Sequence, residues 1–472
     1  MVDPLSFGPA DPRLRRLNDK PVATRGDFVV YWMQVFRRAD DNAALAFAVE
    51  RANELGVPCL VYEALRPDYP HASDRLHRFV LEGARDTAQG LAERGLSHAF
   101  FLPRTADEAR GVALKLASRA RLLVSDDFPS FVVRTHNAKM AERAPCAFFV
   151  VDDCAVVPTA LTAKAEIGAR TLRPKVTRAL DAWLRPIAEP TPAVRPPPRI
   201  DLPFTPVDLT TADGPALDAL LQSCAIDHAV PPVDATPGGS REAERRLAAF
   251  VRGPLATYDA DHNDPSRQAD SGLSPYLHFG MVSARRVALE ARTWGRGAGL
   301  EAFLEQLIVR RALSFNFARS RPDHPEWTAL PAWARATLEK HAADGRYEEM
   351  SLADLEAARS PDELWNAAMN ELRARGVIQS YARMLWGKLP LLWMRRPEQA
   401  HAAMVHLNDK WALDGRDPNG YANVSWCFGL HDRPWPEREV FGTVRAMTST
   451  SARRKLDFEG YIERWNGVAG GE

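Results

Sequence analysis

The sequence has few cysteines, and their positions exclude the sites that cysteines usually build. Five cysteines occur in 472 residues, at positions 59, 146, 154, 224 and 427. They form no CxxC pair and no zinc-ligand spacing, so we expect no metal site. An odd and sparse cysteine count is typical of a reducing compartment. We therefore expect a cytoplasmic protein.

The chain also lacks a net charge and a long apolar run. Lys+Arg and Asp+Glu both number 61, so the formal net charge is zero. This balance excludes a generally basic coat for nucleic acid, although a local basic groove remains compatible with it. No apolar run approaches the roughly 18 residues of a membrane span, and residues 1–26 contain no apolar signal core. We expect a globular protein of two or three domains that does not enter a membrane.

Short apolar runs alternate with helical patterns in the first third of the chain. Expected strands lie at 27–34, 57–65, 98–103, 121–127 and 146–153, and expected helices at 42–55, 74–94 and 106–119. This alternation predicts a doubly wound parallel sheet, a Rossmann-like α/β domain, over residues 27–165, preceded by an N-terminal tail at 1–26. The acidic pairs 126–127 and 152–153 follow two of the strands, where open α/β sheets place ligands and where turn residues also occur.

The composition changes after this domain. Eight prolines lie between Pro186 and Pro206, and such a segment forms neither a helix nor a central strand. We expect a Pro-rich interdomain linker at 166–206. Apolar residues then recur at helical spacing in the segments 214–224, 240–252, 281–294, 300–317, 352–358, 361–376 and 377–389. Residues 207–472 are therefore predicted to form an all-α domain.

Three tryptophans of the second half are candidates for electron transfer. Trp386 and Trp393 are seven residues apart, so on one helix they would share a face about 10 Å apart along the axis, and Trp365 lies nearby in sequence. Spaced indole rings can pass electrons stepwise, and they can equally be plain core packing. Pro390 lies between the two and predicts a kink or the end of that helix.

The same region carries a charge inside an apolar helical stretch. Arg383 requires a carboxylate or an anionic ligand if it is buried, or its head reaches solvent. Asp414, in the polar turn Asp414-Gly-Arg-Asp417, is the natural partner. Ser271 and Ser274 precede a helical stretch, where a hydroxyl caps the helix or binds a phosphate.

Taken together, several segments resemble the class II DNA photolyases of the photolyase/cryptochrome family over residues 27–470. They are FVVYWMQ, DDNAAL, ARTLRPK, HNDPSRQADSGLSPYLHFG, FLEQLIVRRALSFNF, LWNAAMNEL, LDGRDPNGY and REVFGTVRAM. The resemblance implies an α/β antenna domain, a linker and an all-α domain that binds FAD. It implies light-driven repair of UV-damaged DNA, in which an electron from reduced flavin splits cyclobutane pyrimidine dimers. We expect a monomer. The sequence leaves open whether an antenna chromophore is bound and whether it is of deazaflavin or folate type.

Individual residues of this chain match family positions in the cofactor and lesion sites. Tyr258, Ser271, Leu273 and Ser274 match positions around the FAD phosphates and ribitol. Arg383 and Asp414 match a salt bridge beside the flavin ring, with Asp417 in the same loop, and Asn408 matches an asparagine near flavin N5. Trp386, Trp365 and Trp393 match, in that order, the proximal, middle and distal members of the photoreduction chain. Met384 and Trp426 match positions that touch the flipped lesion.

Other positions depart from the family pattern around the lesion. Ala312 stands where the family has a glutamate that hydrogen-bonds the damaged thymine, and His262 replaces an arginine. Gln379 replaces a histidine, and Phe315 replaces an aspartate. Ala312, His262 and Gln379 favour the alternative of a cryptochrome-like blue-light photoreceptor without repair activity, whereas Trp426, Met384 and the REVFGTVRAM segment favour repair. The candidates for a local basic surface are Arg438, Arg445, Arg453, Arg454 and Lys455.

Overall fold

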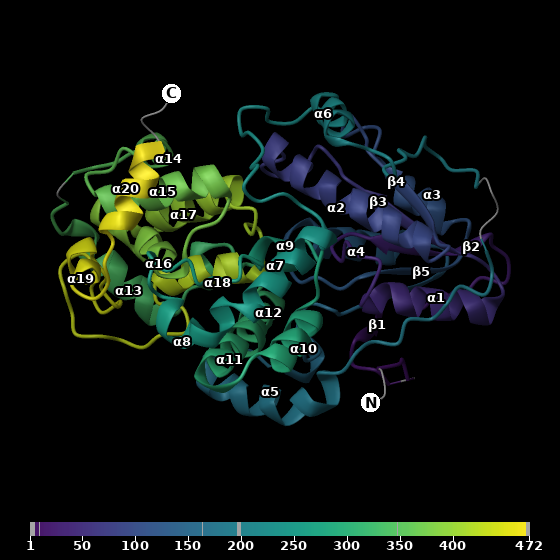
Figure 1. The fold of residues 1–472 in the computed structure, drawn as a ribbon, viewed down its shortest axis with the longest axis horizontal. Coiled ribbons are helices and arrows are strands. Elements are labelled where there is room, and N and C mark those ends of the chain that lie inside the picture. The colour runs from purple at the N-terminus through teal and green to yellow at the C-terminus, as the bar shows by residue number, and fades with distance from the viewer. Residues whose placement is uncertain (1–4, 9, 163, 196–199, 347, 469–472) are drawn as a thin grey trace.

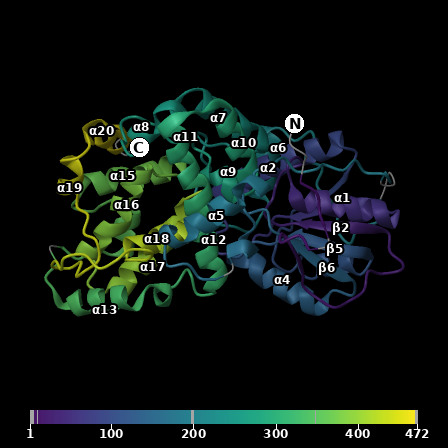
Figure 2. The ribbon, with the colours of Figure 1, turned by 90° about the horizontal axis from the view of Figure 1, so that it is seen from below.

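The chain folds into two lobes that pack side by side (Figure 1). The computed structural model describes residues 5–8, 10–162, 164–195, 200–346 and 348–468. One lobe is a β-sheet with helices on both faces, and the other is built from helices alone. Seen from below, helices α9 and α12 lie between the sheet and the outer helices of the second lobe (Figure 2). Within the described ranges, no helix is long and apolar enough to cross a membrane.

The sheet has six strands in the order β1-β6-β5-β2-β3-β4. Their bounds are β1 Leu14–Arg16, β2 Phe28–Met33, β3 Cys59–Ala64, β4 Ser97–Phe101, β5 Ala120–Asp126 and β6 Ala147–Val151. Strands β2 to β6 are parallel, as expected, and β1 pairs antiparallel with β6. The five parallel strands are short apolar runs because both of their faces are covered by helices. Alternate residues of β2 enter two different cores, Val29 with α1 on one face and Val30 with α3 on the other.

Four helices connect these strands. They are α1 Ala43–Leu55, α2 Asp74–Glu93, α3 Val112–Ala117 and α4 Phe131–Arg143. The Asn42 side chain accepts from the Leu45 N–H at the start of α1, and Gly56 ends this helix in the left-handed conformation with a φ of 66°, which glycine adopts without strain. The helix expected at 106–119 is shorter than predicted, because turns occupy the residues before Gly111.

The tail and the linker contain more regular structure than the sequence indicates. The predicted N-terminal tail supplies β1, whose single apolar residue, Leu14, gives no alternation to detect. The linker range holds α5 Ala169–Trp183, which has Pro174 inside it, and an internal proline normally argues against a helix. Helix α6 Gly214–Gln222, in the range predicted as the all-α domain, packs on α2 of the sheet lobe. Part of the predicted Pro-rich stretch, 196–199, lies outside the described residues.

In the described residues of the second lobe the regular elements are helices, joined by loops of which one contains an isolated bridge between Arg438 and Gly442. Its α-helices are α7 Ser240–Arg252, α8 Tyr258–Asp261, α9 Ser274–His278, α10 Ala284–Trp294, α11 Gly297–Leu304, α12 Arg311–Ser320, α13 Ala332–Lys340, α14 Leu352–Glu356, α15 Glu363–Arg375, α16 Ser380–Lys388, α17 Pro397–Trp411, α18 Pro418–Cys427, α19 Ser449–Arg453 and α20 Glu459–Val468. A π-helical turn at Glu305–Arg310 divides the segment expected as one helix at 300–317. Short 3₁₀ turns lie at Thr159–Thr162, Pro254–Thr257, Trp327–Ala329, His341–Ala343 and Leu389–Leu392.

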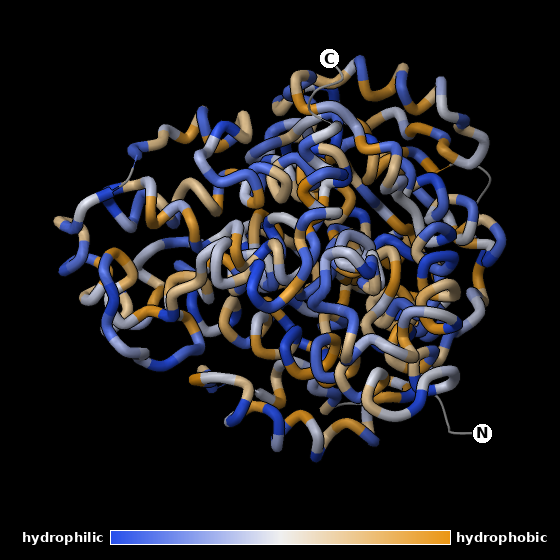
Figure 3. The backbone as a smooth tube through the Cα atoms, turned by 60° about the vertical axis from the view of Figure 1, so that its left-hand side comes forward, coloured by the Kyte–Doolittle hydropathy of each residue, from blue (hydrophilic) through white to orange (hydrophobic). Residues whose placement is uncertain are grey.

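Buried charges join the two lobes. Asp153, after β6, accepts from Arg285 of α10 at 3.0 Å and also pairs with Arg38. Arg75 of α2 is 1% exposed and donates from Nη1 to the carbonyls of Leu372 and Trp411, at 3.1 and 2.8 Å. These carbonyls lie at the C-terminal ends of α15 and α17, where a cation is favoured. Buried hydrophobic clusters lie in both lobes, and hydrophobic stretches alternate with hydrophilic ones along the backbone (Figure 3).

Candidate functional site

The three candidate tryptophans form one continuous row inside the helical lobe. Trp365 of α15 stacks on Trp386 of α16, with ring centroids 6.4 Å apart and planes 13° from parallel. Trp365 also contacts Trp393 edge to face, with centroids 5.6 Å apart. The three side chains are 0%, 1% and 3% exposed. Trp365 therefore lies between the other two, and each step of the row is a ring contact.

The row does not run along one helix face, because the helix ends before Pro390, as the position of this proline predicted. Helix α16 ends at Lys388 and Pro390 lies in the following 3₁₀ turn, so Trp393 leaves the helix that carries Trp386. The indole N–H of Trp365 donates to the main-chain oxygen of Trp386 at 2.8 Å, which fixes the two stacked rings. The Trp386 Nε1 is buried and has no hydrogen-bond partner among the described residues.

Arg383 lies one helical turn before Trp386 and forms a bidentate ion pair. Its Nη1 and Nη2 donate to the two carboxylate oxygens of Asp414, at 2.8 and 2.9 Å. Nη2 also donates to Asn408 Oδ1 at 2.5 Å. Burial raises the pKa of Asp414, but the charge of Arg383 outweighs it and holds this pKa below its usual range. The predicted pairing of Arg383 with Asp414 is present, and Asn408 joins it.

Asn408 is 1% exposed and retains unused hydrogen-bonding capacity. Its Nδ2 donates to Asp409 Oδ1 at 3.3 Å and its Oδ1 accepts from Arg383. An amide has two N–H groups and two oxygen lone pairs, so one donor and one acceptor position remain. A Cβ at Gly420 would lie 3.0 Å from Asn408 Nδ2, which is why a residue without a side chain suits this position.

Asp417 begins helix α18 and closes the same loop. Its Oδ1 accepts from the Asn419 N–H at 2.8 Å, and its Oδ2 lies 3.1 Å from His278 Nδ1. Burial raises its pKa, but the hydrogen bond from His278 and the charge of Arg311 bring the pKa down to about 2. Asp417 is therefore an ionised helix cap that also anchors α9, which His278 ends.

The expected phosphate-binding residues lie at the start of α9. Ser271 Oγ accepts from the Leu273 N–H at 3.4 Å, and Gly272 between them has a φ of 61°. Ser274 is the first residue of the helix and is exposed, whereas Leu273 is 1% exposed. Ser274 is among the groups that lower the pKa of Asp414, so this turn adjoins the Arg383 ion pair.

Two of the departures from the family pattern contact each other. The His262 ring stacks on Tyr258 with centroids 4.6 Å apart. The Gln379 Nε2 donates to the His262 carbonyl at 2.8 Å, while its Oε1 accepts from the N–H groups of Tyr381 and Ala382. Gln379 therefore caps α16 and ties it to the segment that carries Tyr258. Both residues therefore have structural contacts in addition to the lesion-pocket positions that the resemblance implies.

Met384 and Trp426 lie on neighbouring helices, α16 and α18, and both are partly exposed. The Nζ of Lys388 lies 5.5 Å from the centroid of the Trp426 ring and donates to the Cys427 carbonyl at 2.8 Å. Lys388 is 1% exposed, and burial lowers its pKa. Two partly exposed apolar side chains therefore lie on α16, which carries Trp386, and on α18, which packs against it.

The remaining departures occupy two different environments. Ala312 is 5% exposed in the core of the helical lobe. Phe315 is fully buried in the core that includes the sheet; its ring packs edge to face on Phe128, and Arg311 lies over it at 4.7 Å. Phe315 therefore faces the sheet lobe, in a different core from Ala312.

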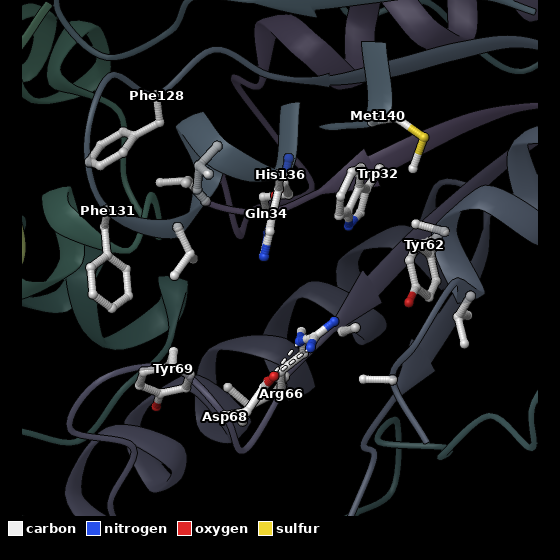
Figure 4. A pocket seen from close by; sticks show the side chains of 18 of the residues that line it. Trp32, Gln34, Tyr62, Arg66, Asp68, Tyr69, Phe128, Phe131, His136 and Met140 are labelled. Atoms are coloured by element: carbon white, nitrogen blue, oxygen red, sulfur yellow. Dashed lines mark hydrogen bonds and ion pairs between the residues drawn. The ribbon is translucent and has the colours of Figure 1, made fainter. Parts of the chain in front are cut away.

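The sheet lobe contains a cavity of about 300 Å³ at the carboxyl ends of β2, β3 and β5 (Figure 4). Trp32 stacks on His136 at 5.8 Å along one wall, and Tyr62 and the Arg66–Asp68 ion pair line others. Phe128, Phe131 and Tyr69 also line it, together with the cations Arg37, Lys139 and Arg416. Ligands of open α/β sheets bind at this edge.

The acidic pairs that drew attention in the sequence do not line this cavity. Asp126 accepts from the N–H groups of Gln34, Val35 and Phe36, so it shapes the turn after β2. Asp153 pairs with the arginines at the lobe interface. The turn-residue interpretation is therefore the better one. The cavity itself is lined by aliphatic, aromatic and basic residues from separate segments, and no local motif marks it.

The sequence of this chain is similar to the sequences of known proteins. A family profile described as DNA photolyase matches residues 29–197. A deoxyribodipyrimidine photo-lyase of Methanothermobacter thermautotrophicus is 37% identical over 97% of this chain and 98% of its own length. One from Oryza sativa subsp. japonica is 37% identical over 94% of this chain and 88% of its own length. The chain belongs to the DNA photolyase family.

Solved structures of photolyases share the fold. A bacterial class III photolyase from Agrobacterium tumefaciens superimposes with a TM-score of 0.68 at 16% identity, covering 94% of this chain and 87% of that one. An archaeal photolyase from Sulfolobus tokodaii, described with two FAD molecules and a light-harvesting cofactor, gives a TM-score of 0.63 at 18% identity and covers 93% and 89%. Photolyases with the same two lobes thus include members outside class II, so the fold alone does not assign the class.

Proposed function

We propose that this protein is a class II type photolyase that uses FAD and light to split cyclobutane pyrimidine dimers in DNA. The observation that carries the proposal is the stacked tryptophan row that ends beside the Arg383–Asp414–Asn408 cluster. Relatives that are 31–37% identical are named deoxyribodipyrimidine photo-lyase and match this chain over 91% or more of its length.

The residues of this cluster fit a flavin. The buried Trp386 Nε1 lacks a partner in the described part of the chain, and Asn408 keeps one donor and one acceptor position. Buried polar groups normally have partners, so a polar ligand beside them would complete the site. Arg383 and Asn408 would hold the ring, and Ser271, Leu273 and Ser274 the phosphates, at the start of α9. FAD in its reduced form would supply the light-excited electron for dimer cleavage.

The protein's own contribution is orientation, charge and electron supply. Arg383 places a fixed positive charge beside the ring site, where it favours an anionic ring. Trp386, Trp365 and Trp393 would supply electrons in that order, because Trp365 contacts both of the others. Met384 and Trp426 would contact the dimer, which must leave the base stack to reach the site.

The cavity of the sheet lobe would bind the antenna chromophore. Its aromatic lining, which includes Trp32 and Tyr62, suits a planar ring system, and its volume of about 300 Å³ is at the lower end of small-molecule sites. The deazaflavin and folate types both remain candidates for this site.

An exposed arginine–tryptophan stack follows α18 and is a candidate DNA contact. Trp435 is 36% exposed, and the guanidinium groups of Arg433 and Arg445 lie 5.5 and 5.0 Å from its ring centroid. The main-chain N–H of Trp435 donates to the Thr443 carbonyl at 2.8 Å, which closes the loop. Arg453, one of the basic candidates from the sequence, is instead paired with Glu363 and Glu459. Arg445, another of these candidates, belongs to the stack, which is therefore a better candidate for the basic surface than Arg453.

We expect Arg445→Ala to weaken DNA binding and its salt dependence together. Removing one phosphate contact should lower the slope of log affinity against log salt by about 1. Fluorescence anisotropy with a dimer-containing duplex at several salt concentrations measures the slope. Arg110→Ala is the matched control, because Arg110 is 79% exposed on the sheet lobe. Equal slopes for the wild type and Arg445→Ala would contradict the contact.

The alanine at position 312 predicts weak lesion binding that a longer side chain would improve. We expect repair to be present but inefficient, because Ala312 makes no side-chain hydrogen bond to the dimer. A hydrogen bond to a buried polar group contributes about 1–3 kcal/mol, which is about 5- to 150-fold in affinity. Ala312→Glu should therefore tighten dimer binding and raise the repair yield.

Ala312→Gln is the matched variant for this test, because it can hydrogen-bond without burying a charge in a position that is 5% exposed. Lesion affinity and thermal unfolding are measured together for both variants. If neither variant binds the dimer more tightly than wild type while both remain folded, position 312 does not face the lesion.

The rival function is a photoreceptor that photoreduces its flavin without repairing DNA. Reduced protein is illuminated with blue light in the presence of an oligonucleotide that carries one thymine dimer. Chromatographic detection of restored thymines supports repair. Normal photoreduction with no restored thymine, in wild type and in both Ala312 variants, would establish the photoreceptor instead.

A further inference from the structure

The cavity of the sheet lobe carries an excess of positive charge. Its lining contains the arginines and lysine Arg37, Arg66, Lys139, Arg143 and Arg416, against the single acid Asp68. Arg66 is paired with Asp68 at 2.5 Å, and Arg37 is paired with Glu63 at 2.8 Å. Lys139 and Arg143 are exposed. Arg416 therefore differs from the others, because it is buried and has no carboxylate within ion-pair distance in the described residues.

Arg416 lies at the end of the cavity nearest the helical lobe, which we call the inner end. Its guanidinium carbon is 5.7–5.8 Å from the ring centroids of Tyr69, Phe131 and Phe279. In Figure 4, Tyr69 and Phe131 lie at this end, and Trp32 and Tyr62 at the opposite end. Arg416 is 2% exposed, and its Nη2 is buried without a hydrogen-bond partner among the described residues. A buried guanidinium N–H without a partner calls for an acceptor.

The backbone holds Arg416 in this position against its conformational preference. Its φ is 61°, in the left-handed region that residues other than glycine rarely adopt. The Arg416 N–H donates to Asp409 Oδ1 at 2.9 Å, and its carbonyl accepts from Ser130 Oγ at 3.4 Å. Strained residues persist where the surrounding structure over-determines them, and such positions cluster at ligand sites. Arg416 lies in the loop between Asp414 and Asp417 of the helical lobe, and it is the residue of this loop whose side chain lines the cavity.

We propose that Arg416 binds an ionised oxygen of the ligand at the inner end of the cavity. The ligand class is a planar aromatic chromophore with a negative charge, so the inference rests on the antenna role proposed above. The charge could belong to an ionised hydroxyl on the ring or to a phosphate on the side chain. Both offer the charged acceptor that the Arg416 Nη2 lacks, and hydrogen bonds to charged groups are the strong ones.

Two pairs of probes distinguish these sources. Riboflavin and FMN differ by a phosphate, and 5-deazariboflavin and 8-hydroxy-5-deazariboflavin differ by an ionisable ring hydroxyl. Binding of each is measured by equilibrium dialysis on protein that is first saturated with FAD. The wild type should bind the charged member of at least one pair about 10- to 150-fold more tightly than its neutral partner, as one charge-assisted hydrogen bond requires.

The variant Arg416→Asn should abolish that preference. Asparagine tolerates a positive φ, so the loop keeps its backbone conformation while the charge is lost. Arg66→Asn is the matched control, because it removes a cation from the same cavity whose charge is already paired. This control should keep the preference, whereas a general electrostatic attraction would fall equally in both variants. Arg416→Lys, which retains the charge, should keep part of it.

The results distinguish a failure of the Arg416 contact from a failure of the antenna role of the cavity. Binding without a charge preference in wild type, or a preference that survives in Arg416→Asn, overturns the role of Arg416 and leaves the antenna role intact. If no probe binds the wild type, the antenna role fails and the inference fails with it. If Arg416→Asn does not fold, the inference requires Arg416→Lys to lose more of the preference than Arg66→Asn. An equal preference in these two variants overturns it.

Discussion

Replacing Trp386 with phenylalanine should leave FAD bound and nearly abolish flavin photoreduction by an external thiol. Phenylalanine fills most of the volume of this 1% exposed side chain, but its ring is oxidised far less readily. The substitution removes no described hydrogen bond, because the Trp386 Nε1 has no partner and the Trp365 N–H donates to the main chain of residue 386. The loss should therefore be one of electron transfer and not of folding.

The other members of the row provide graded comparisons. Trp365→Phe and Trp393→Phe should also slow photoreduction, because Trp365 contacts both neighbours. Trp327→Phe is the matched control, since Trp327 packs near His401 and Phe428 and not in the row. The rate at which oxidised-flavin absorbance disappears under blue light is the measurement. Unchanged photoreduction rates in all three row variants would show that these tryptophans only pack the core and do not carry electrons.

Replacing Asp414 with alanine should greatly reduce the flavin content of the purified protein. Asp414 accepts both hydrogen bonds of the bidentate pair, and the Arg383 side chain is 12% exposed. Removing one partner of a buried pair leaves an uncompensated charge at a cost of about 3–5 kcal/mol. If that cost falls on the flavin-binding conformation, the affinity drops by about 10²- to 10³-fold or more.

The matched variant for this position is Asp414→Asn, which keeps the shape and one hydrogen-bond acceptor without the charge. It should retain more flavin than Asp414→Ala. The flavin-to-protein ratio is measured from absorbance after denaturation, and circular dichroism shows whether the helices remain. Full flavin retention in folded Asp414→Ala would refute the role of the ion pair in cofactor binding.

The strands of the sheet could be predicted from the sequence because each is a continuous apolar run between turn residues. Strands β2 to β6 lie within three residues of their expected ends. Strand β1 escaped because three residues carry no pattern, and α5 escaped because Pro174 lies within it. These elements depend on partners distant in sequence: Leu14 of β1 pairs with Val151.

The candidate site shows the same division. The pairing of Arg383 with Asp414 could be predicted, because a charge in an apolar helix needs a partner. The interposed position of Trp365 could not be derived from spacing, since it depends on how α15 packs on α16. The cavity could not be predicted either, because its walls combine residues at the ends of three strands with Arg416. Arg416 lies nearly 300 residues after the end of β5 in the sequence, and loop residues from distant segments often form binding sites.

The central claim is that reduced flavin in this protein splits thymine dimers under light. The most direct test uses chemically reduced protein, without oxygen, mixed with an oligonucleotide that carries one thymine dimer, in light and in darkness. Restored thymines counted by chromatography should rise with illumination only. Chemically reduced Trp386→Phe should repair as well as the wild type, because its defect lies in electron supply. No restored thymine in either protein under light would contradict the account.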